Sequence, residues 1–77
     1  LSDPADFARL SKEYSDLTEV SEAVSQLRKL QQELKENEQL AKDNTFDSEL
    51  RELAHEEVQA IKEKLPELEH QIRLLLL

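Results

Sequence analysis

The chain has 77 residues, of which 36% are charged, and it contains no Gly, no Cys and two Pro. A phosphate-binding loop needs Gly, so none is expected. Without Cys the chain has no disulfide, zinc knuckle or thiol nucleophile, and the absence of disulfides favours a cytoplasmic location. The net charge is −8 and Arg28-Lys29 is the only adjacent basic pair, which argues against direct nucleic-acid binding because phosphate recognition needs clustered cations.

A first helix is predicted from about residue 4 to residue 41. Asp3-Pro4 is typical of a helix start, since a residue before Pro is extended, as an N-cap requires, and Pro suits the first helical position. Apolar residues follow at helical steps, which predicts a helix roughly 55 Å long and an elongated molecule. We expect Tyr14 to pack in the core. The apolar stripe consists of Phe7, Leu10, Tyr14, Leu17, Val20, Val24, Leu27, Leu30 and Leu34.

A bend at 42–47 and a second helix at about 48–76 are predicted next. Asp43-Asn44-Thr45 is rich in turn-forming residues, and Asp47 is a suitable N-cap. Apolar residues then alternate at steps of four and three, which predicts coiled-coil-like packing against the first helix. This heptad seam consists of Ala54, Val58, Ile61, Leu65, Leu68, Ile72 and Leu75.

Pro66 lies inside this second helix and removes one backbone hydrogen bond. A proline in a helix interior lowers stability by about 3 kcal/mol. We therefore expect an all-α, elongated antiparallel hairpin whose second helix is kinked at Pro66. Some apolar residues would stay uncovered, so a partner segment is expected: another helix of a parent chain, a second copy or a different protein. These residues are Ala8, Ala23, Leu53, Leu76 and Leu77.

Two Glu-x-x-His pairs, Glu52 with His55 and Glu67 with His70, have the spacing of di-iron bundle ligands. The heptad places Glu52, Glu67 and His70 on the outer face, and the pairs are roughly 22 Å apart along one helix. The zinc-protease motif begun by His55 would need a second His where Gln59 stands. We predict a non-enzyme with no catalytic, cofactor-binding or metal-binding residue. Four serines of the first helix are expected on its surface and not in a catalytic site: Ser11, Ser15, Ser21 and Ser25.

The order of four sequence blocks resembles the N-terminal domain of bacterial class-I peptide chain release factors. The second block and the last block resemble the type that reads UAA and UAG. The blocks are Leu1-Ser2-Asp3-Pro4, Leu10-Ser11-Lys12-Glu13-Tyr14-Ser15-Asp16-Leu17, Asp47-Ser48-Glu49-Leu50-Arg51-Glu52-Leu53-Ala54 and Leu74-Leu75-Leu76-Leu77.

The resemblance implies that 1–77 is a single helical domain, a fragment of a multidomain protein, and that a first helix of its bundle is missing here. It implies translation termination, with the catalytic Gly-Gly-Gln loop in a later domain. The implied partners are the ribosome near the stalk base and the remaining domains, with no membrane and no direct nucleic-acid readout by this segment. The alternative is a coiled-coil dimerisation scaffold, in which the isolated chain self-associates.

Overall fold

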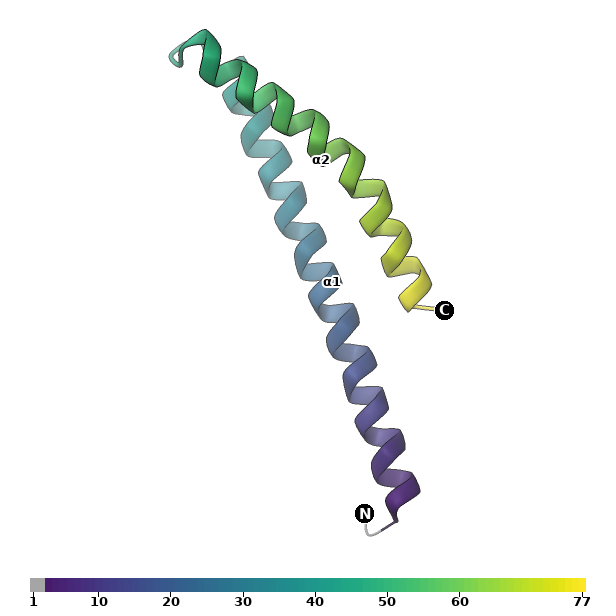
Figure 1. Ribbon diagram of the computed structural model, residues 1–77. Helices are drawn as coiled ribbons and strands as arrows, with labels where there is room; N and C mark the ends of the chain where they lie inside the picture. Colours follow the sequence, from purple (N-terminus) through teal and green to yellow (C-terminus); the bar gives the residue numbers. More distant parts are fainter. Residues whose placement is uncertain (1–2) are drawn as a thin grey trace.

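In the computed structural model, which describes residues 3–77, the chain folds as two long α-helices joined by a short bend (Figure 1). Helix α1 spans Pro4–Lys42 and helix α2 spans Ser48–Leu75, and no strand occurs within 3–77. Leu1 and Ser2, which open the first sequence block, lie outside the described residues. The molecule measures 64 × 19 × 13 Å, so the predicted elongated all-α hairpin is confirmed.

Both helices begin at the predicted aspartates. The Oδ1 atom of Asp3 accepts a hydrogen bond of 2.9 Å from the amide of Ala5, and Pro4 occupies the first helical position. The Oδ1 atom of Asp47 accepts one of 2.9 Å from the amide of Leu50. Each cap satisfies an amide that has no partner within its helix, and each carboxylate faces the positive end of the helix dipole.

The bend between the helices forms without glycine and, within residues 3–77, without any positive φ angle. Asp43 ends α1 in an extended conformation, with φ −84° and ψ 110°. Its Oδ1 accepts hydrogen bonds from the Oγ1 of Thr45 at 2.6 Å and the amide of Thr45 at 2.9 Å. These two bonds, with a smaller contribution from the charge of Arg51, hold the pKa of Asp43 below its usual 3.8.

The core is a single seam, and all of its buried side chains come from α2. Ile61 is completely buried, and the other four are Ala54, Val58, Leu68 and Ile72. Leu65 is half-buried and Leu75 is exposed at the end of the seam. Helix α1 contributes only half-buried apolar residues, because each of them has one neighbouring helix on one side and solvent on the other. The predicted seam of α2 is thus confirmed over most of its length.

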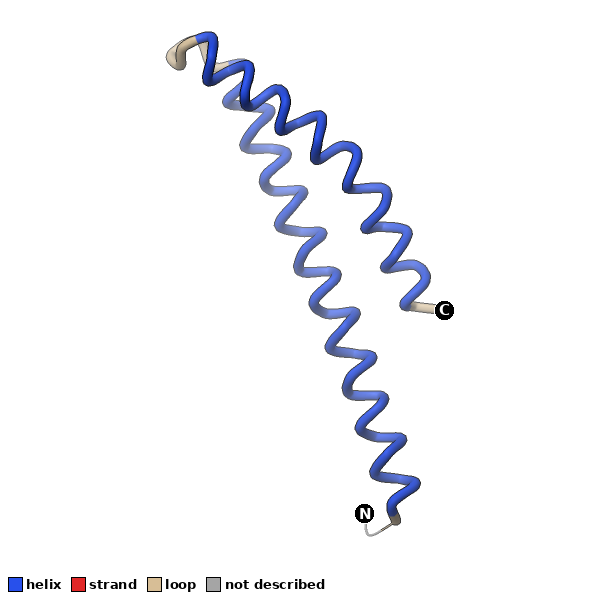
Figure 2. The backbone as a smooth tube through the Cα atoms, in the orientation of Figure 1, coloured by secondary structure: helices blue, strands red, loops and turns tan. Residues whose placement is uncertain are grey.

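Pro66 does not interrupt α2, which continues to Leu75. Its side chain is exposed, so the carbonyl that loses its amide partner lies on the side open to water. Figure 2 shows α2 curving along its length, with no break in the helix. Within residues 3–77, neither helix is long and apolar enough to cross a membrane.

Candidate interaction surfaces

Both Glu-x-x-His pairs lie on α2, and the exposure of Glu52, Glu67 and His70 agrees with the heptad. His55, which the heptad did not place, lines a groove between the helices. Glu52, His55, Glu67 and His70 are all exposed. The 15 residues that separate the pairs correspond to about 22 Å of helical rise, so the two pairs do not converge. Across residues 3–77, no group of three or more His, Cys, Asp or Glu side chains could hold a metal ion.

The serines singled out from the sequence are also exposed, on α1. They are spread along the helix, and no side-chain hydrogen bond within residues 3–77 joins one of them to a histidine. None of them therefore has the base that a nucleophilic serine requires. The four residues are Ser11, Ser15, Ser21 and Ser25.

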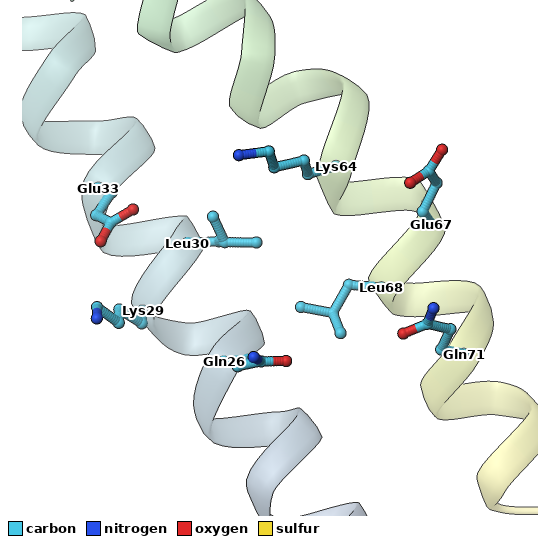
Figure 3. A pocket seen from close by; sticks show the side chains of 8 residues that line it. All are labelled: Gln26, Lys29, Leu30, Glu33, Lys64, Glu67, Leu68 and Gln71. Carbon is cyan, nitrogen blue, oxygen red and sulfur yellow. The ribbon is translucent and has the colours of Figure 1, made fainter.

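A groove of about 340 Å³ lies between the middle of α1 and the C-terminal half of α2 (Figure 3). Leu30 and Leu68 face each other across it, and polar side chains form its rims. Acidic and basic groups alternate there, and the ion pairs found within residues 3–77 lie elsewhere, in α1. Its ionisable groups do not converge on one point, so we interpret the groove as a packing gap between the two helices and not as a ligand-binding site. The rim residues are Gln26, Lys29, Glu33, Lys64, Glu67 and Gln71.

The N-terminal part of α1 extends well beyond the end of α2 (Figure 1). Leu30 and Leu68 line one interhelical groove, and Ala41 and Val58 line another. Because the helices are antiparallel, moving seven residues forward from Leu68 to Leu75 corresponds to moving about seven residues back from Leu30 on α1. Leu75 therefore lies opposite about residue 23 of α1. We call 4–19 the projecting segment, because α2 does not reach it.

Four of the nine residues of the predicted apolar stripe lie in the projecting segment, where α2 does not cover them. Every residue from 7 to 19 is exposed, with Phe7 at 66% and Tyr14 at 75% of full accessibility. The prediction that Tyr14 packs in the core is therefore wrong for this chain. The spacing correctly places Tyr14 on the apolar stripe, but the second helix ends before it can cover this position.

Within the segment, side-chain interactions are local and exposed. Arg9 pairs with Asp6 at 3.3 Å and Lys12 with Asp16 at 3.2 Å, while Thr18 donates to the backbone of α1. Such exposed pairs contribute about 0.3–0.5 kcal/mol each, and a single helix of this length is marginal in water without tertiary packing. Covering the apolar stripe of the projecting segment would therefore stabilise this part of α1.

A second apolar surface lies at the opposite end of the hairpin, beside the bend. Phe46, Leu50 and Leu53 are exposed there, and we call these three residues the tip patch. The sequence predicted an uncovered Leu53, but the predicted seam begins at Ala54 and includes neither Leu50 nor Phe46. The signal that could have identified Phe46 is its position, since it is a large apolar residue in an otherwise polar bend.

Comparison with known proteins gives matches over the whole chain. The PCRF domain family matches residues 1–77. Peptide chain release factor 1 of Solidesulfovibrio magneticus is 43% identical over 77 residues, which are 100% of this chain and 21% of the relative. The proteins of the same name from Oleidesulfovibrio alaskensis and Caulobacter vibrioides are 41% identical over 71 residues (92% of this chain) and 40% identical over 75 residues (97%). They are covered over 19% and 20% of their lengths, so the chain spans about a fifth of these relatives. No solved structure matches it.

Proposed function

Because the chain belongs to the PCRF domain family, we propose that it is a helical module of a peptide chain release factor and acts in translation termination. The observation that carries this proposal is the 43% identity to a protein named peptide chain release factor 1 over all 77 residues. The module takes no part in bond cleavage; it helps to position the factor on the ribosome near the stalk base.

The physical support for a positioning role is the shape of the hairpin. Its buried side chains are used in the seam between the helices, and its exposed large apolar side chains lie in the projecting segment, in the tip patch and at the C-terminal end of α2. The hairpin is 64 Å long and holds the projecting segment and the tip patch far apart, and within residues 3–77 no three His, Cys, Asp or Glu side chains could hold a metal ion. Such a module contributes binding free energy and orientation, which affect factor affinity more than the chemical step.

We further propose that 1–77 is one domain of a longer multidomain chain. The relatives are about five times longer than this chain, since it covers 21% of one of them. In that setting, the helix that the family carries ahead of this segment packs on the projecting segment. Phe7, Leu10, Tyr14 and Leu17 form the stripe it would cover. Covering them removes apolar surface from water at about 25 cal/mol per Å².

The proposal is tested in the full-length protein that contains this chain. Peptide release is measured on ribosomes stalled at a stop codon, over a range of factor concentrations, for the complete protein and for one lacking 1–77. A positioning module predicts that the deletion raises KM by at least about tenfold and changes kcat by less than about threefold. An unchanged KM with a large fall in kcat would contradict the proposal, and circular dichroism verifies that the remaining domains stay folded.

A dimerising coiled-coil scaffold is the alternative function. The seam residues that would form such a dimer, including Val58 and Ile61, are already buried against α1 of the same chain. A second copy would have to use exposed apolar side chains such as the stripe of the projecting segment, whose flanks carry both acidic and basic groups, including Asp6 and Arg9. Sedimentation at several protein concentrations distinguishes the two functions: a tight dimer at micromolar concentration favours the scaffold, and a monomer favours the release-factor module.

A further inference from the structure

One side of the hairpin carries a row of basic side chains. Arg28, Lys35 and Lys42 follow one another at intervals of seven residues on α1, and all three are exposed. Seven residues make about two helical turns, so the three cations lie along one side of α1 at intervals of about 10.5 Å. No two of these three residues are adjacent in the sequence, and it is the helical repeat that brings them into line.

The second helix adds to this side of the molecule. Two neighbouring hollows lie there, one on the surface of α1 and one between the helices, and Lys42 lines both. Lys35 lines the first hollow, and Lys62 of α2 lines the second. Among the residues that line the two hollows, Glu38 is the one acid. We call the four cations on this side the basic flank: Arg28, Lys35, Lys42 and Lys62.

The basic flank is a local excess of positive charge on a chain whose net charge is −8. The groove at Leu30 differs from it, because acidic and basic side chains balance there: Lys29, Glu33, Lys64 and Glu67. The ion pairs within residues 3–77 both lie in the projecting segment and use none of the flank cations. The flank cations can therefore bind an external anion without first breaking an ion pair of the hairpin.

The surroundings of the flank on α1 are polar. Every exposed residue of α1 between 28 and 42 is charged or Gln. A stable protein–protein contact is usually centred on buried aromatic or aliphatic side chains, and this part of α1 offers none at its surface. A row of cations with Gln between them instead suits a phosphate backbone, because Lys, Arg and Gln side chains all donate hydrogen bonds to phosphate oxygens.

We propose that the basic flank binds the phosphate backbone of RNA, an inference that rests on the proposed function on the ribosome. Each cation in the row displaces a counterion from the polyanion, which favours binding at low salt. Such contacts orient a protein on RNA and read no base sequence. The flank runs along the side of the rod, so this contact would fix the direction of the hairpin.

The electrostatic part is tested by combining Lys35→Gln with Lys62→Gln in the full-length protein that contains this chain. The control combines Lys29→Gln with Lys64→Gln, which removes the same charge from one exposed lysine of each helix. Lys29 lies about 120° around α1 from Lys35, and Lys64 lies about 160° around α2 from Lys62, so the control acts on a different side.

Equilibrium binding to stalled ribosomes is measured over a range of salt concentrations. Each lost phosphate contact should reduce the slope of log K against log salt by about 0.7–0.9, so the affinity advantage of the unchanged protein over the flank variant should shrink roughly tenfold between about 50 and about 200 mM salt. The control should change this slope by less than about 0.5. Circular dichroism verifies that both variants keep their helix content.

The nature of the partner is tested by directed cleavage of ribosomal RNA. Gln39→Cys lies between Lys35 and Lys42, and Gln26→Cys lies on the rim of the groove at Leu30. Each cysteine carries a tethered Fe(II)-EDTA group in the full-length protein, whose other cysteines have been replaced. RNA strand breaks should be at least about fivefold stronger from position 39 than from position 26, because a flank that contacts phosphates holds the tether beside RNA.

Equal changes of slope in the two lysine pairs would overturn the proposal, because they would reflect net charge and not the flank. A reduced slope in the flank variant without RNA cleavage from position 39 would also overturn it and would indicate an acidic protein partner. If removal of 1–77 weakens ribosome binding but the flank variant behaves like its control, the RNA contact is wrong and the proposed function stands. If removal of 1–77 leaves binding intact, both are wrong.

Discussion

Ile61→Ala is the substitution that most directly tests the packing of the hairpin. Ile61 is completely buried at the centre of the seam, and the change removes three carbon atoms from it. At about 0.8 kcal/mol per buried CH₂, the transfer term alone is about 2.4 kcal/mol. Part of the resulting void can close, because the seam is open to solvent along its edges, so the expected loss lies at the lower end of the usual 2–5 kcal/mol for Ile→Ala.

Thermal and urea unfolding followed by far-ultraviolet circular dichroism measure this loss. For a domain of this size, 2.4 kcal/mol corresponds to a fall in Tm of roughly 10–20 °C. Leu74→Ala removes a side chain of the same size from an exposed position of the same helix and should change stability by less than about 0.5 kcal/mol. Equal losses for the two variants would mean that Ile61 is not at the centre of the core and would refute the assigned seam.

Three further predictions concern single positions. Pro66→Ala should raise the free energy of unfolding by up to about 3 kcal/mol, since it restores an amide donor at an exposed position of α2; an unchanged or lower Tm would contradict this. The pKa of Asp43 is lowered by its bonds from Thr45, so its contribution to stability is present above about pH 3.8 and is lost as the pH falls through the lowered value; Thr45→Ala should raise the pKa of Asp43 in a nuclear magnetic resonance titration, and no change would contradict the assigned cause. Glu67→Ala and His70→Ala should each change stability by less than about 0.5 kcal/mol, and a loss near 2 kcal/mol would show that these exposed side chains have partners.

The features that the sequence predicts correctly depend on neighbouring residues. Asp3 and Asp47 cap their helices because a carboxylate can reach an amide two or three positions ahead. Ile61 is buried because it belongs to a periodic seam whose partner is the adjacent helix in the chain. The resemblance to class-I release factors, predicted from ordered blocks of residues, is confirmed by the family match over the whole chain.

The placement of Tyr14 could not be predicted from periodicity, because periodicity identifies the face of a helix and not what covers it. Tyr14 and Leu17 follow the same spacing as Leu27 and Leu30, yet only the second pair lies beside α2. Helix lengths carry the missing information. With 39 residues in α1 and 28 in α2, an antiparallel pair that starts at a common bend must leave one end of α1 unpaired.

Two of the exposed apolar surfaces lie far apart in the molecule, and the exposed leucines at the C-terminal end of α2 lie between them along α1. The projecting segment and the tip patch lie at opposite ends of a structure 64 Å long, and they share no side chain. Substitutions at sites this far apart, without common partners, act independently. Tyr14→Ala and Leu53→Ala should therefore change the free energy of unfolding additively, and a coupling energy well above about 0.5 kcal/mol would contradict this independence.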